Sequence, residues 1–301
     1  MTRFALAPDH LYTPDDLGGG FAVLIEAGQI GDVCTVSALA PDTPVQEVSG
    51  ALAPGFIDLQ VNGGGGVLFN DAPNTDGLAA IAAAHRRFGT TGFLATLISD
   101  DMSRVAAAIA AVEEAMARGL PGLLGIHLEG PFLNPAKRGV HDAAKFRALD
   151  SDAVALICAR RRGATLVTLA PELAPPGAIA ALTRAGVIVA AGHSQATYEQ
   201  MATARTEGLS GVTHLFNAMS PLESRAPGVV GAALDFADLW CGLIADGHHV
   251  HPAAMRVALR AKGAARLALV TDAMPTVGSA HNAFQLAGQT IRSQGGRLVT
   301  A

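Results

Sequence analysis

Short, almost uninterrupted apolar runs alternate with alanine-rich segments along most of the chain, from about residue 53 to residue 275. Parallel strands that are buried on both faces have continuous apolar sequences of this kind, and alanine-rich segments are typical of helices. The eight apolar runs cover residues 53–62, 91–98, 122–130, 164–172, 186–194, 211–218, 240–250 and 266–275. The clearest helical segments cover residues 78–88, 103–119, 152–163, 177–186 and 253–263. Eight strands that alternate with helices predict an α/β fold, a (β/α)8 barrel of the TIM type.

Both ends of the chain have a different pattern. Residues 1–50 contain short apolar segments joined by glycine turns, of which "EAGQIG" is the clearest, and they predict the N-terminal part of a small β domain. Residues 51–301 form the barrel domain, whose last segment, residues 281–300, reads as a β-hairpin around "SQGG". No helical segment follows the eighth run, so we expect a small β-sandwich domain that is incomplete at the C-terminal end of the chain.

The composition argues against several classes of protein. Half of the 301 residues are hydrophobic, which is enough for a large core, and the net charge is -5. This charge gives no general attraction to nucleic acid or to an anionic membrane. The three cysteines, Cys34, Cys158 and Cys241, lack the spacing of a metal site, and we interpret them as reduced thiols of a cytoplasmic protein. The first residues do not resemble a signal peptide, and no apolar run is long enough for a membrane span.

Seven of the eight apolar runs end in polar or ionisable residues. These residues are Asp58, Gln60 and Asn62; Glu129; Glu172; His193 and Ser194; His214 and Asn217; Asp246, His248 and His249; and Asp272. The carboxyl ends of the strands of a barrel share one rim, where the active sites of such barrels are built. We therefore expect side chains that are far apart in the sequence to converge there.

Glu129, His193 and His214 are the candidates for a metal site. A carboxylate and two imidazoles on neighbouring strand ends form a three-ligand set that leaves one coordination position open, as in catalytic zinc sites. Each of them alone could instead be a hydrogen-bonded rim residue. Asp272, at the end of the eighth run, could take a proton from a water molecule and hand it to a leaving group. Its alternative role is that of a helix N-cap.

Three further features carry weaker signals. His249 lies beside His248 and close to His251, and its neutral imidazole N–H could donate to a substrate carbonyl oxygen. Arg225, in a loop rich in glycine and proline, could bind a phosphate, although a solvated loop arginine is the simpler interpretation. The segment "NGGGG" at residues 62–66 lacks the spacing and the lysine of a phosphate-binding P-loop.

Several segments together resemble the N-acetylglucosamine-6-phosphate deacetylases of the amidohydrolase superfamily. The segments are "PGFIDLQVNG", "HLEGPFLNPAKRGVH", "LAPE", "AGHSQAT", "THLFNAMSPL", "GLIADGHHVHP" and "LVTDAMP", in this order along the chain. The resemblance implies a metal-dependent hydrolysis of the N-acetyl group of N-acetylglucosamine 6-phosphate, which yields glucosamine 6-phosphate and acetate. It also implies a homodimer, and further strands and a last barrel helix beyond residue 301.

The resemblance also implies a role for each site residue. Glu129, His193 and His214 would hold the metal. Asp272 would be the general base and then the acid, and His249 would polarise the acetyl carbonyl. The residues that would contact the sugar phosphate are His141, Asn217, Ala218 and Arg225, together with His249.

The first apolar run bears on the number of metal ions. Many amidohydrolases carry a His-x-His motif there, which binds a second metal, whereas this chain has Gln60 and Asn62. The two amides alternate onto one side of the strand, and amides are poor zinc ligands compared with imidazoles. We therefore expect one divalent metal ion per subunit, with Zn²⁺ as the expected ion.

Two alternatives remain open at this stage. The chain could be an amidohydrolase that acts on another N-acyl amino sugar or on a cyclic amide. It could also be a truncated, non-catalytic barrel that binds a sugar phosphate. The presence of Glu129, His193, His214 and Asp272 together argues against this second alternative.

Overall fold

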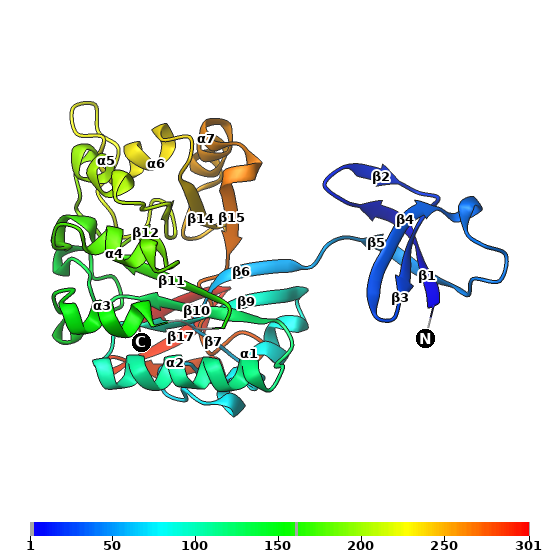
Figure 1. The fold of residues 1–301 in the computed structure, drawn as a ribbon, viewed down its shortest axis with the longest axis horizontal. Coiled ribbons are helices and arrows are strands. Elements are labelled where there is room, and N and C mark those ends of the chain that lie inside the picture. Colours follow the sequence, from blue (N-terminus) through cyan, green and yellow to red (C-terminus); the bar gives the residue numbers. More distant parts are fainter. Residues whose placement is uncertain (1–2, 160–161, 301) are drawn as a thin grey trace. The chain divides into compact units, whose positions relative to one another are not determined.

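The computed structural model describes residues 3–159 and 162–300. The chain forms two compact units, the first ending at Phe56 and the second beginning at Ile57 (Figure 1). The strand β5 (Val45–Leu52) belongs to the first unit and runs past residue 50, because it pairs in parallel with β1 (Arg3–Tyr12). None of the described helices is both long and apolar enough to cross a membrane.

The N-terminal unit is a single five-stranded sheet. Its order is β2-β1-β3-β4, and β5 pairs with β1. The remaining strands are β2 (Asp16–Gly18), β3 (Phe21–Glu26) and β4 (Gln29–Thr35), and a short 3-10 turn, η1, covers Val36–Ala38. Ala5, Ala22 and Leu24 form its small buried cluster. Among the described residues this unit contains one sheet, and not the two stacked sheets of a complete sandwich.

The second unit contains the predicted barrel. Its eight strands are β6 (Phe56–Val61), β9 (Thr90–Ile98), β10 (Leu123–Glu129), β11 (Ala164–Leu169), β12 (Ile188–Ala191), β13 (Gly211–Val212), β14 (Trp240–Ile244) and β15 (Leu267–Val270). They follow one another around the sheet in sequence order, and the pairs from β9 to β15 are parallel. Seven strands lie within one of the eight apolar runs and β9 begins one residue before its run, so the predicted barrel is confirmed. A single parallel bridge between Val61 and Ala273 joins the first strand to the chain after the last.

Helices connect most of the strands. They are α1 (Thr75–Arg86), α2 (Met102–Ala117), α3 (Ser151–Cys158), α4 (Ala178–Arg184), α5 (Tyr198–Thr206), α6 (Gly228–Asp235) and α7 (Pro252–Lys262). Five of them overlap the predicted helical segments, and α5 and α6 are additional. The helix α3 ends at Cys158, and part of the segment predicted there, residues 160–161, lies outside the described residues. Helix α5 begins with a reciprocal capping box between Thr197 and Gln200, which satisfies two of its free backbone donors.

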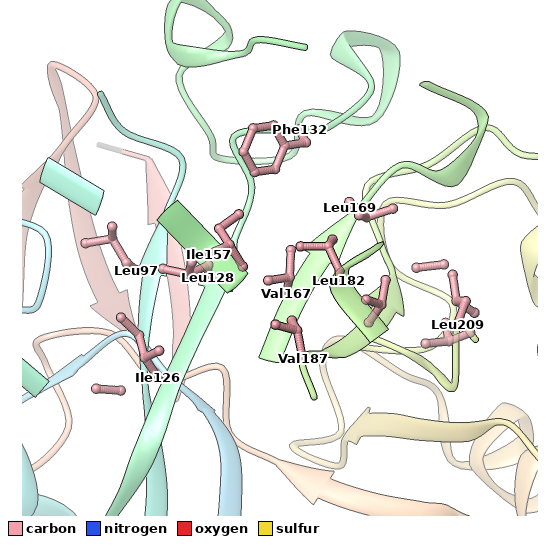
Figure 2. Close-up of a cluster of buried hydrophobic side chains, with 14 of the residues drawn as sticks. Leu97, Ile126, Leu128, Phe132, Ile157, Val167, Leu169, Leu182, Val187 and Leu209 are labelled. Atoms are coloured by element: carbon pink, nitrogen blue, oxygen red, sulfur yellow. The ribbon is translucent and has the colours of Figure 1, made fainter. Parts of the chain in front are cut away.

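Alternate residues of the strands separate the core from the site. Ile126 and Leu128 of β10 belong to the large apolar cluster between the strands and the helices, which also includes Ile157 of α3 (Figure 2). His127 and Glu129 of the same strand point to the other side, because side chains alternate along a strand. The strand therefore packs its helices with one face and presents polar groups to the barrel interior with the other.

The C-terminal segment differs from the predicted hairpin. It is a three-stranded antiparallel sheet of β16 (Ala283–Leu286), β17 (Gln289–Gln294) and β18 (Arg297–Thr300). The expected turn at Gly295 and Gly296 joins β17 to β18. A second turn, at Ala287 and Gly288, was not predicted, because Ala287 adopts a positive φ of 47° that is unusual for an alanine. Within the described part of the chain, β15 is followed by this sheet and not by a helix.

Candidate metal and catalytic site

The side chains of Glu129, His193 and His214 meet at one point of the barrel rim. Glu129 is the last residue of β10, and the two histidines follow β12 and β13. The Oε1 atom of Glu129 lies 3.1 Å from Nε2 of His193 and 2.9 Å from Nε2 of His214, and the two Nε2 atoms are 3.0 Å apart. All three residues are buried. The structure thus brings together the three ligands that the sequence proposed.

The backbone is strained where these side chains leave the strands. His193, His214 and Asp272 have φ angles of 49°, 35° and 50°, in the left-handed region that residues other than glycine seldom occupy. Such conformations cost free energy and persist at functional sites, where they direct a side chain toward a required position. The strand ends therefore turn abruptly at the residues that form the site.

The charges of the three groups stabilise one another. Burial raises the pKa of Glu129, but the hydrogen bonds to His193 and His214 outweigh it and hold this pKa well below its usual range. Burial lowers the pKa of His214, but the bond to Glu129 and the charge of that carboxylate raise it overall. Glu129 is consequently ionised at neutral pH, as a metal ligand must be.

The contacts of His193 fix its tautomer. Its Nδ1 lies 2.8 Å from the carbonyl oxygen of Lys137, so Nδ1 carries the proton that it donates to that oxygen. Nε2, which lies against Glu129, would then bind a metal ion in place of its proton, and this is the usual arrangement of a metal-binding histidine. Two imidazole nitrogens and a carboxylate oxygen this close together repel one another unless a proton or a cation lies between them. The donor set therefore fits a divalent metal ion.

Glu172 holds the segment around His193 in place. One of its carboxylate oxygens accepts hydrogen bonds from Asn134 Nδ2, at 2.9 Å, and from the backbone N–H of Gln195, at 2.6 Å. The other accepts one from Ser194 Oγ at 2.7 Å. Glu172 thereby connects the loop after β10 with the two residues that follow His193. The sequence placed Glu172 at the rim without giving it a role.

Asp272 is bound to the first strand. Its Oδ1 accepts a hydrogen bond from Asn62 Nδ2 at 2.6 Å. Burial, and then the charge of Glu129, raise the pKa of Asp272 to about 6. A carboxylate that titrates near neutral pH is suited to accept and return a proton. The hydrogen bond to Asn62 joins residues that are 210 positions apart, and no local pattern in the sequence indicates it.

His249 lies on the rim of a cavity of about 410 Å³ that Asp272 also lines. Its Nδ1 is 2.7 Å from Oδ2 of Asp246, so this nitrogen donates to the carboxylate. The other nitrogen, Nε2, can then donate a hydrogen bond only when the ring is a protonated imidazolium. The neutral imidazole donor expected from the sequence stays a prediction, and it requires the single proton of the ring to be on Nε2 instead of Nδ1.

The other expected substrate residues lie at different depths. His141 is buried, its Nε2 is 3.8 Å from Oε2 of Glu129, and burial lowers its pKa to about 3. It therefore lies beside the metal ligands, deeper than a residue that only meets the substrate. Asn217 and Ala218 are partly exposed, and the Asn217 amide donates to the backbone carbonyl oxygens of His214 and Leu215. Arg225 is exposed on the loop before α6.

The chain is similar in sequence to proteins of known family. The sequence pattern of the amidohydrolase family matches residues 51–286. The chain is 47% identical to the N-acetylgalactosamine-6-phosphate deacetylase of Shewanella sp. (strain ANA-3), over 83% of this chain and 65% of that protein. It is 35% identical to the N-acetylglucosamine-6-phosphate deacetylase of Haemophilus influenzae, over 99% of this chain and 79% of that protein.

A solved structure is similar over the whole described fold. The crystal structure of N-acetylglucosamine-6-phosphate deacetylase from Pasteurella multocida matches with a TM-score of 0.93 at 33% sequence identity. The match covers 100% of this chain and 79% of that one. The chain therefore spans between about two thirds and four fifths of the length of these three proteins.

Proposed function

The chain belongs to the amidohydrolase family, and on that premise we propose that it removes the N-acetyl group of N-acetylglucosamine 6-phosphate. The products are glucosamine 6-phosphate and acetate. One observation carries the proposal, namely the convergence of Glu129, His193 and His214 at the barrel rim, with Asp272 after β15 on the same rim. This is the arrangement that a hydrolase of amide bonds needs, because it combines a cation site with a carboxylate that titrates near neutral pH.

We assign one divalent metal ion per subunit, Zn²⁺, to Glu129, His193 and His214. When bound, the ion would supply Lewis-acid activation of the attacking water and of the acetyl carbonyl. Asp272 accepts the proton of that water and returns it to the nitrogen that leaves. His249, which is held in place by Asp246, polarises the acetyl carbonyl as negative charge develops on its oxygen.

The remaining residues bind the sugar phosphate. The guanidinium of Arg225 is exposed and forms a bidentate pair with the 6-phosphate. Asn217 and Ala218 lie in the same connection, between β13 and α6, and contact the sugar. His141 approaches the acetamide from beside Glu129. Binding of the phosphate therefore orients the acetamide toward Asp272.

A second substrate has specific support. The identity of 47% to an N-acetylgalactosamine-6-phosphate deacetylase is higher than the 35% to the Haemophilus influenzae enzyme. The two sugars differ only in the configuration at one ring carbon, so the same metal site and base serve both. N-acetylgalactosamine 6-phosphate is thus the second candidate substrate.

One experiment tests these assignments. The purified 301-residue chain is loaded with Zn²⁺, its metal content is measured, and acetate release is followed from both 6-phosphates and from unphosphorylated N-acetylglucosamine. We expect about one metal ion per subunit and release of acetate from a 6-phosphate only. Arg225→Ala should raise KM for the 6-phosphate and leave kcat nearly unchanged, with Arg266→Ala as a control. Metal binding without any release of acetate would favour a non-catalytic sugar-phosphate-binding barrel.

Two further properties belong to the proposal. On the number and spacing of its cysteines, Cys34, Cys158 and Cys241, we assign the protein to the cytoplasm with reduced thiols. We also assign it a homodimeric state, which light scattering of the purified chain tests.

A further inference from the structure

Two amide side chains on one strand each donate to a different carboxylate of the site. Gln60 Nε2 donates to Oε1 of Glu129 at 3.0 Å, and Asn62 Nδ2 donates to Oδ1 of Asp272 at 2.6 Å. Both amides are buried, with 1% and 0% of their surface exposed. Glu129 is an assigned metal ligand and Asp272 is the assigned base, so each amide contacts the carboxylate of one of these two residues.

The orientation of the Asn62 amide is set by Asp272. An ionised carboxylate can only accept, so Asn62 must turn its NH₂ group toward it. As a result, Asn62 Oδ1 is buried without a hydrogen-bond partner among the described residues. A buried acceptor without a partner is costly, and an asparagine that served only to fill the core would turn to satisfy it. The contact with Asp272 therefore determines this conformation.

The two carboxylates need to be kept in different states. Asp272 faces the charge of Glu129, which raises the pKa of Asp272, whereas the amide of Asn62 lowers it. The other titratable groups near Asp272 are His193 and His214, which also lower this pKa, and His249 and Asp246, which line the same cavity. Each carboxylate has its own amide donor, Gln60 on Glu129 and Asn62 on Asp272, so the polar surroundings of the two groups differ.

We propose that Gln60 positions the metal ligand Glu129 and that Asn62 positions the base Asp272. This inference rests on the proposed function. Each amide is a fixed N–H donor. The contact from Gln60 orients the Glu129 carboxylate as a metal ligand, and the contact from Asn62 orients the Asp272 carboxylate for proton transfer. Each amide therefore controls a different measurable property of the enzyme.

The test exchanges each amide for an apolar side chain of similar shape. Gln60→Leu should weaken Zn²⁺ binding by about 10- to 100-fold, since the ligand loses its orienting partner. Asn62→Leu should leave the Zn²⁺ dissociation constant within about threefold of the wild type, lower kcat by up to about 100-fold and change KM little. It should also move the acid limb of the kcat/KM profile to higher pH. Asn62→Asp, which adds a negative charge instead of a donor, should move that limb further still.

A second measurement does not depend on turnover. The carboxyl carbon signal of Asp272 is titrated by NMR in the metal-free wild type and in Asn62→Leu, and its pKa should rise in the variant. An unchanged pKa of Asp272 in Asn62→Leu would overturn the proposal. An equal loss of Zn²⁺ affinity in Asn62→Leu and in Gln60→Leu would overturn it as well. Thermal unfolding of each variant shows that it is folded. If the wild type releases no acetate but the Asp272 pKa and the Zn²⁺ affinities of the variants change as expected, the proposed function is contradicted and the positioning roles of Gln60 and Asn62 are still supported.

Discussion

The carboxylate of Asp58 is hydrogen-bonded to Thr271, 213 residues further along the chain. Its Oδ2 accepts from the Thr271 hydroxyl at 2.6 Å and from the Thr271 backbone N–H at 3.2 Å. These two residues belong to the first strand of the barrel and to the chain just after the last one. Together with the bridge between Val61 and Ala273 and the hydrogen bond from Asn62 to Asp272, this carboxylate links the two edges of the sheet.

Removal of this link should destabilise the barrel. Asp58→Ala removes a buried carboxylate that accepts from the N–H and the hydroxyl of Thr271, and we expect the free energy of unfolding to fall by about 1–3 kcal/mol. Urea unfolding followed by circular dichroism measures this change. Asp71→Ala, which removes an exposed aspartate of the same unit, is the control and should change stability by less than about 0.5 kcal/mol. Equal effects of the two substitutions would show that the link is not structural.

The metal site should depend on each of its three ligands. His193→Ala removes one nitrogen from the set, and we expect the Zn²⁺ content of the purified protein to fall from about one ion per subunit to nearly none, because two ligands hold the ion weakly. His248→Ala, which removes an exposed histidine, should keep the ion. Metal analysis after dialysis compares the two variants, and an unchanged content in His193→Ala would exclude this residue as a ligand.

The substitution Asp272→Asn should separate metal binding from turnover. The asparagine keeps the shape of the side chain and can still accept from Asn62, but it cannot accept a proton. We expect normal Zn²⁺ content and a loss of kcat of about 10²- to 10⁴-fold. Acetate release under saturating substrate provides the measurement. A nearly normal rate would mean that another group is the base.

The same substitution should stabilise the metal-free protein at high pH. The pKa of Asp272 rises from 3.8 to about 6 on folding, first through burial and then through Glu129. Its contribution to stability is therefore complete below pH 3.8 and is lost as the pH rises through about 6. At pH 8 we expect Asp272→Asn to be more stable than the wild type by about 1–3 kcal/mol. Urea unfolding at pH 8 and at pH 4 tests this, and the difference should nearly vanish at the lower pH.

Glu172 is not an assigned metal ligand, but we expect it to increase Zn²⁺ affinity by holding the segment that carries His193. Glu172→Ala leaves Asn134, Ser194 and the Gln195 N–H without their common acceptor, so the segment that carries His193 becomes less ordered. We expect the Zn²⁺ dissociation constant to rise by about 10- to 100-fold. Competition with a chromogenic chelator measures it. Glu199→Ala, an exposed residue of α5, is the matched control, and equal Zn²⁺ affinity of both variants would contradict a role for Glu172.

The sequence by itself determined the eight strands and the positions of the residues that could do chemistry. Apolar runs predicted the strands because burial on both faces requires them. The ends of the runs identified Glu129, His193, His214 and Asp272, because parallel strands in a barrel end at one rim. This reasoning uses local periodicity and one topological rule, and neither depends on the detailed packing.

The tertiary structure alone decided which polar groups bind one another. The link from Asp58 to Thr271, the donation from Asn62 to Asp272 and the pairing of His249 with Asp246 depend on side-chain rotamers and on backbone turns with positive φ. The first two join residues more than 200 positions apart, and the last one holds the His249 ring in its orientation. Such contacts are formed when the strands close into a barrel, so no pattern along the sequence specifies them.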